Sequence, residues 1–373
     1  MAKRVIKVEE DEIESDRLEG FPHPRATPDI IGHHAALTEA SGAIACGRMH
    51  HAWLISGPRG IGKATLAYRL ARTLLKYGVG ADLPPDLAMA EGDQVYRWIK
   101  ALSHPDFLLL RRQVDDKGRI QNVLSVAVAR QAVEFFSLSA GEGGWRVCIV
   151  DSVDDMNLAA ANALLKILEE PPAKSIFLLI SHSPGRLLPT IRSRCRKLIL
   201  SPLSDADLMR AVAQHFPEMN SEDLNLTAKL TQGSPGRALA LIRDSGLDQF
   251  REMIRLLMAL PTLDIAALHA LGDRLSRANA GHSYETMMEM LTTWLARMVR
   301  LGALGSIPPD RVAGEGALMQ RLLAAAPLDQ WTQVWENINT LLRRADSVNL
   351  SRKQVILSIF SRLAQTAQTA QRR

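Results

Sequence analysis

A short glycine-rich segment constrains the fold of this chain more than any other feature. Residues 51–67 read HAWLISGPRGIGKATLA, an apolar run typical of a buried strand, then a glycine turn, then a helical stretch. Gly57, Gly60 and Gly62 allow the backbone to wrap around an anion. Lys63 supplies a positive charge at the start of the helix, where free N–H groups favour phosphate. Strand, turn and helix in this order predict a phosphate-binding loop.

Four further segments have the composition of buried strands. Each is short, rich in Val, Ile, Leu or aromatic residues and nearly continuous in its apolarity, which is typical of strands covered on both faces of a parallel sheet. Helical patterns lie between them, so the order of elements predicts a doubly wound α/β domain. The four segments are residues 106–112, 145–151, 175–181 and 196–200.

The strand pattern stops near residue 203, and helical patterns follow to the end of the chain. We therefore expect an α/β domain, a small helical lid and a larger helical bundle. The first 20 residues hold four basic and seven acidic side chains and no periodicity, which predicts a disordered acidic tail. The expected boundaries are 1–20 for the tail, 21–203 for the α/β domain, 204–248 for the lid and 249–373 for the bundle.

Composition narrows the cellular setting. The cysteines number three and lie far apart in sequence, without a metal-binding spacing, which favours a reducing cytoplasm and no disulfides. No signal-like leader or membrane-spanning apolar run is present, so we expect a cytoplasmic protein with no membrane partner. The net charge of +5 fits nucleic acid or an acidic partner, but it equally fits ordinary solvated charge.

Two positions depart from the pattern of a hydrolysing site. Lys63 is followed by Ala64, whereas a hydroxyl there normally ligates Mg²⁺. Thr65 is a poor substitute, because one helical step turns a side chain by about 100°. Asp151, at the end of a predicted strand, has the position of the usual Mg²⁺ carboxylate. The next residue is Ser152, which cannot act as a base near neutral pH, so the residues argue against ATP turnover.

Two groups outside the loop leave their roles open. Asp154 and Asp155 are expected to cap the following helix together with Asn157. Arg194 follows a short helix just before the last predicted strand. It either interacts with that helix terminus or reaches across a subunit boundary as an arginine finger. Position alone does not decide between these two roles.

Three segments together carry a family resemblance. HHAWLISGPRGIGKATLA, VCIVDSVDDMNLAAANALLKILEEPP and LLPTIRSRCRKLIL, in this order, closely resemble the delta-prime family of bacterial DNA polymerase III clamp-loader subunits. The resemblance covers roughly residues 21–245, and the tripeptide Ser193–Arg194–Cys195 makes it specific to clamp loaders. The helical remainder is consistent with the family's collar domain.

The resemblance implies a fold and a function. It implies an AAA+ P-loop domain with a lid and a C-terminal helical collar, in a five-membered loader that places a sliding clamp on primed DNA. Delta-prime subunits are stators that do not hydrolyse ATP and that offer an SRC arginine, here Arg194, to ATP on a neighbouring motor subunit. The chain would then be part of a DNA polymerase (nucleotidyltransferase) complex with motor and delta subunits as partners.

Alternatives to the stator remain. One is a catalytically active AAA+ motor that uses Lys63, Thr65 and Asp151, and another is a plain interaction module with a vestigial loop. ATP binding is expected to be weak or absent. Many family members carry a four-cysteine zinc module near residues 76–105, where this chain has no cysteine, so we expect no zinc and no other resident metal. Gly236 stands where motor subunits have a nucleotide-sensing arginine, with Arg237 one place further on.

Overall fold

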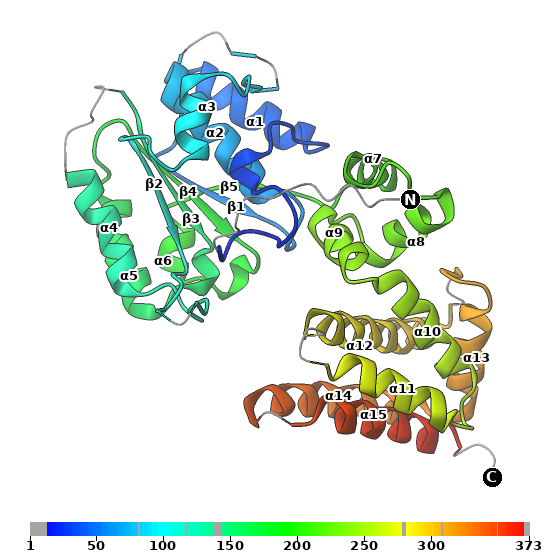
Figure 1. Ribbon diagram of the computed structural model, residues 1–373. Coiled ribbons are helices and arrows are strands. Elements are labelled where there is room, and N and C mark those ends of the chain that lie inside the picture. Colours follow the sequence, from blue (N-terminus) through cyan, green and yellow to red (C-terminus); the bar gives the residue numbers. More distant parts are fainter. Residues whose placement is uncertain are drawn as a thin grey trace. The chain divides into compact units, whose positions relative to one another are not determined.

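The chain divides into two compact units in the computed structural model (Figure 1). The first comprises Met1–Pro217 and Thr231–Arg237, and the second comprises Glu218–Leu230 and Ala238–Arg373. No helix among the described residues is long and apolar enough to cross a membrane. The structure describes residues 13–80, 83–84, 86–116, 118–137, 144–277, 281–306, 309–348 and 350–368.

A parallel sheet forms the centre of the first unit. Within the described residues its strands are arranged in the order β2-β3-β4-β1-β5. All residues of β1 and β4 are buried, which explains their continuous apolarity. All five predicted strands are confirmed. Their bounds are Ala52–Ser56 (β1), Phe107–Arg111 (β2), Arg146–Asp151 (β3), Ser175–Ser181 (β4) and Arg196–Ile199 (β5).

Helices cover both faces of this sheet (Figure 1). Alternate strand residues point to opposite faces, and each face has its own apolar core. One core packs against α1, α2 and α3 and the other against α4, α5 and α6. The doubly wound α/β prediction is therefore confirmed. The helices are His34–Ala45 (α1), Lys63–Tyr77 (α2), Gln94–Lys100 (α3), Val126–Ser137 (α4), Leu158–Glu169 (α5) and Pro189–Arg192 (α6), with a 3₁₀ turn at Pro24–Ala26 (η1).

The remainder of the described chain is helical. The predicted lid, residues 204–248, does not form a compact unit of its own, because α7 lies in the first unit and most of α8 in the second. This division into two units does not test the functional domain boundaries, which stay predictions. The second unit packs around the buried Trp294 and Trp331. The helices are Asp205–His215 (α7), Ser221–Thr231 (α8), Pro235–Arg243 (α9), Gly246–Met258 (α10), Ile265–Leu275 (α11), Gly281–Ala303 (α12), Glu315–Ala325 (α13), Leu328–Val348 (α14) and Arg352–Ala367 (α15).

Candidate nucleotide site

The phosphate-binding loop joins β1 to α2 at the carboxyl edge of the sheet. Gly57, Gly60 and Gly62 have φ angles of 151°, 79° and 103°, a region that side chains rarely adopt. A Cβ atom on Gly57 would lie 2.4 Å from the carbonyl oxygen of Leu200. The loop therefore requires glycine for its shape. Its backbone is a suitable cradle for a phosphate chain at the start of α2.

Lys63 is engaged by its own loop. Its side chain is buried, and Nζ donates hydrogen bonds to the carbonyl oxygens of Gly57 at 2.8 Å and Pro58 at 2.6 Å. Burial lowers the pKa of Lys63 to about 8, although the nearby carboxylates of Asp151 and Asp154 act in the opposite direction. In this conformation the ammonium group holds the loop closed on itself.

Asp151 ends β3 and lies on the same edge of the sheet. Burial, together with the charge of Asp16, raises the pKa of its carboxyl to about 7, although Lys63 opposes the shift. The hydroxyl of the next residue, Ser152, is buried and makes no hydrogen bond. Ala64 packs against the apolar core, and Thr65, the next residue on α2, is half-buried. The loop backbone thus fits a phosphate chain, whereas Ala64 and Ser152 do not fit metal-assisted hydrolysis.

The two aspartates after β3 do not cap α5. Asp154 accepts hydrogen bonds from the Ser181 hydroxyl at 3.1 Å and from the backbone N–H groups of His182 and Ser183, which ties the end of β4 to the 3₁₀ turn after β3. Asp155 pairs with Arg112. The expectation of capping by Asp154 and Asp155 was wrong, because both carboxylates have other partners. Only Asn157 caps α5, by accepting from the N–H of Ala160 at 2.9 Å.

Residues just before and within α9 contact the loop directly. The N–H of Gly236 donates to the carbonyl oxygen of Gly60 at 2.8 Å, and the Ser234 hydroxyl donates to that of Arg59 at 2.9 Å. A Cβ atom on Gly236 would lie 2.9 Å from the Cα of Gly60. Glycine is therefore required at position 236, where a sensing arginine was expected in motor subunits, and the sequence did not predict this backbone contact.

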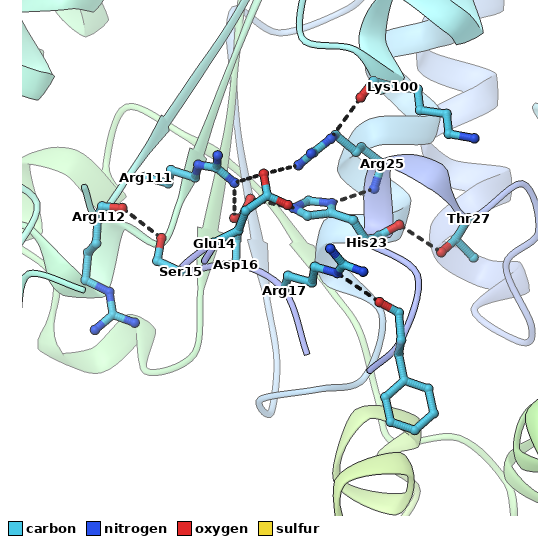
Figure 2. Close-up of polar contacts among 11 residues, drawn as sticks. Glu14, Ser15, Asp16, Arg17, His23, Arg25, Thr27, Lys100, Arg111 and Arg112 are labelled. Carbon is cyan, nitrogen blue, oxygen red and sulfur yellow. Dashed lines mark hydrogen bonds and ion pairs between the residues drawn. The ribbon is translucent and has the colours of Figure 1, made fainter. Parts of the chain in front are cut away.

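Residues 13–20 are not a disordered tail (Figure 2). The side chains of Glu14 and Asp16 are 5% and 1% exposed. One nitrogen of Arg111 contacts Glu14 at 2.8 Å and Asp16 at 2.5 Å. Arg25 pairs with Glu14 at 2.8 Å, and His23 Nε2 lies 3.1 Å from Asp16. The prediction of a disordered tail was wrong for residues 13–20, because basic side chains further along the chain pair with the carboxylates of this segment. Residues 1–12 lie outside the described part of the chain.

This segment borders the candidate site. Arg111 is the last residue of β2 and is paired in register with Asp151 on β3. The charge of Asp16 also acts on Asp151 and on the buried hydroxyl of Tyr68. The segment 13–25 is thus held against the carboxyl edge of the sheet beside the candidate metal carboxylate.

Arg194 lies between α6 and β5, with its side chain 32% exposed. Nη2 pairs with Oε1 of Glu169 at 2.7 Å, and Nη1 donates to the carbonyl oxygen of Thr190 at 2.9 Å. The guanidinium is therefore ordered and also reachable from solvent. The role of an arginine finger stays a prediction, because it concerns a neighbouring subunit.

Metal ligands do not gather in the described part of the chain. No group of three or more His, Cys, Asp or Glu side chains there could hold a metal ion. Cys148 and Cys195 are buried, and Cys46 is exposed. Within residues 76–105, the described contacts include ion pairs of Lys76 with Asp93 and of Arg69 with Asp86. The expectation that zinc is absent stays a prediction.

The fold and the loop together define a class. The parallel sheet has the order β2-β3-β4-β1-β5, a glycine loop and Lys63 follow β1, and a carboxylate ends β3. With the helical segments that follow, this is the arrangement of a P-loop domain of the AAA+ type. Residues 32–204 match a family described as DNA polymerase III, delta subunit. These residues contain the loop, Asp151 and Arg194.

Curated relatives agree with this match. The chain is 35% identical over 218 residues to DNA polymerase III subunit delta' of Pseudomonas aeruginosa, covering 58% of this chain and 63% of the relative. It is 36% identical over 197 residues to the delta' subunit of Escherichia coli, covering 53% and 56%. The matches thus span less than two thirds of either relative. The chain is similar to delta' subunits over these residues, which supports a clamp-loader subunit and confirms the resemblance.

Other relatives and the solved structures are less similar to this chain. The tau subunit of Escherichia coli is 30% identical over 226 residues, covering 58% of this chain and 32% of the relative. A gamma subunit-related protein of Thermotoga maritima aligns with a TM-score of 0.39 and 16% identity, covering 90% of this chain and all of that one. The RuvB branch migration motor of the same organism aligns with a TM-score of 0.40 and 18% identity, covering 82% and 94%.

Proposed function

We propose that this chain is the stator subunit of a bacterial sliding-clamp loader. It does not hydrolyse ATP itself, and Arg194 completes the ATP site of a neighbouring motor subunit. The similarity to delta' subunits supports the stator role. The chemistry of its own site also supports it, because Ala64 and Ser152 lack the metal-ligating hydroxyl and the acid that ATP hydrolysis requires.

The contacts and the exposure of Arg194 are the observation that supports its proposed role in a neighbouring ATP site. Its guanidinium contacts Glu169, Thr190 and the Ser193 hydroxyl, and its side chain is 32% exposed, which leaves it accessible to a γ-phosphate held by another chain. An arginine placed in this way neutralises the charge that develops in the transition state and is worth about 10³–10⁵ in rate.

The remaining parts of the proposal follow from the same role. The partners are the motor subunits and a delta-type subunit in a hetero-pentamer of the DNA polymerase III holoenzyme, which acts on the sliding clamp and primed DNA in the cytoplasm. The chain binds ATP weakly or not at all and carries no zinc. In its own site, Lys63 would face the phosphates of a bound nucleotide, but no hydrolytic step is assigned there.

The test measures ATP hydrolysis by a reconstituted loader. Arg194→Ala is expected to silence the neighbouring site, so that the burst of hydrolysis in one loading event falls by one equivalent of ATP. Arg192→Ala removes the same charge two residues away and is the matched control. An unchanged burst from a normally assembled Arg194→Ala loader would refute the trans role. Hydrolysis by the purified chain alone, abolished by Lys63→Ala, would instead support the motor.

A further inference from the structure

Arg194 is held by an acid from a different element. Glu169 is the last residue of α5, whereas Arg194 lies after α6, and their Oε1 and Nη2 atoms are 2.7 Å apart. The carbonyl oxygen of Thr190 accepts a second hydrogen bond, from Nη1. Contacts from two elements to two different nitrogens fix the plane of the guanidinium as well as its position.

The place of Glu169 is unfavourable for a carboxylate. A negative charge in the last turn of a helix is repelled by the helix dipole, and here Glu170 adds a second acid. The pair is also partly exposed, with side chains 49% and 32% accessible, so its contribution to folding stability is small. Neither helix stability nor fold stability accounts for the acid at this position, whereas the orientation of Arg194 does.

We propose that Glu169 is a positioning residue for Arg194, an inference that rests on the proposed function. A guanidinium has five N–H donors. The contacts to Glu169, Thr190 and the Ser193 hydroxyl use at most three of these donors, so others are available for phosphate oxygens. Because the long side chain is already ordered in the free subunit, less conformational freedom is lost when it meets the transition state. Glu169 acts through Arg194 and does not itself contact the nucleotide.

The experiment compares four variants of the full chain in a reconstituted loader. Glu169→Ala is expected to lower kcat at the neighbouring site by roughly tenfold with an unchanged KM for ATP, because orientation matters chiefly in the transition state. Glu169→Gln keeps an acceptor oxygen and is expected to retain more of the rate. Glu170→Ala removes the adjacent acid and should leave the rate unchanged. Arg194→Ala measures the full effect of the finger.

The outcomes separate this inference from the proposed function. If Arg194→Ala leaves turnover unchanged, the proposed function fails. If Arg194→Ala lowers turnover but Glu169→Ala does not, only the role of Glu169 is overturned. A Glu169→Ala variant that turns over faster would show that the acid restrains the arginine, which also overturns the inference. Thermal unfolding and assembly of each variant are measured alongside, and a loss of kcat without a change in either supports positioning.

Discussion

Replacing Arg111 by methionine is expected to destabilise the α/β unit strongly. Arg111 is the shared cation of Glu14 and Asp16, whose side chains are 5% and 1% exposed. Methionine keeps much of the length but leaves two buried carboxylates with less compensation. Removing one partner of a buried ion pair costs roughly 3–5 kcal/mol. Since Arg25 remains beside Glu14 and Arg111 is itself 23% exposed, we expect the lower end, about 3 kcal/mol.

The measurement is equilibrium unfolding in denaturant at pH 7, with the slope of the transition compared between variants. Arg112→Met is the matched control, because Arg112 pairs with Asp155 through side chains that are 22% and 32% exposed. A partly exposed pair of this kind is worth about 1 kcal/mol or less. Combining Arg111→Met with Glu14→Gln and Asp16→Asn should recover much of the loss, because the uncompensated charges are removed.

Two results would refute this reasoning. A loss below about 1 kcal/mol for Arg111→Met would mean that the carboxylates are not desolvated. An absence of recovery in the combined variant would mean that the loss came from packing of the arginine stem rather than from charge. Either result would mean that the ion pairs of Arg111 with Glu14 and Asp16 contribute little to the stability of the unit.

Three further predictions concern the same edge of the sheet. Burial alone would raise the pKa values of Glu14 and Asp16, but neighbouring cations outweigh this effect and hold them below 4.5 and 3.8, respectively. The two carboxylates therefore stabilise the folded state above these pH values. This stabilisation is lost as the pH falls through the lower folded values, and an acid titration of Asp16→Asn by circular dichroism should show a weaker dependence. Burial raises the pKa of Asp151 from 3.8 to about 7, so stability falls as the pH rises between these values. Asp151→Asn should therefore unfold at higher denaturant than the parent at pH 8 but not at pH 4, and an equal effect at both pH values would contradict the assignment. Gly236→Ala should cost about 1–3 kcal/mol in unfolding experiments, because its Cβ would lie 2.9 Å from the Cα of Gly60, whereas Gly185→Ala, whose Cβ would meet nothing within 4 Å, should cost less.

Local sequence patterns predicted the inner strands of the sheet because these strands are buried on both faces, whereas the edge strands β2 and β5 are partly exposed. The segments containing β1 and β4 are continuously apolar, and every residue of these strands is buried. The loop was predictable for a similar reason, since the positive φ angles of Gly57, Gly60 and Gly62 depend on residue type at fixed spacing. Asn157 likewise caps the helix that immediately follows it. All of these features depend on neighbours within a few residues.

Contacts between distant residues could not be predicted in this way. The acids of residues 13–20 suggested disorder because their cations, Arg25 and Arg111, lie outside that window. Asp154 was expected to cap a helix, but its carboxylate accepts a hydrogen bond from the hydroxyl of Ser181, which lies on β4. Gly236 was noted because an arginine was expected at this position, and its contact with Gly60 was not predicted. A window of sequence holds no information on partners brought together only by the fold.

The retention of a phosphate-binding loop without hydrolytic residues has a structural explanation. Lys63 donates to two carbonyl oxygens of its own loop, and Gly60 accepts from Gly236, so the loop has bonding partners that require no nucleotide. These contacts hold the turn between β1 and α2, and β1 pairs with β5, the strand that follows Arg194. The shape of the loop therefore does not depend on a hydroxyl at position 64, where Ala64 offers no metal ligand. The loop can therefore persist as a scaffold whether or not it binds a nucleotide.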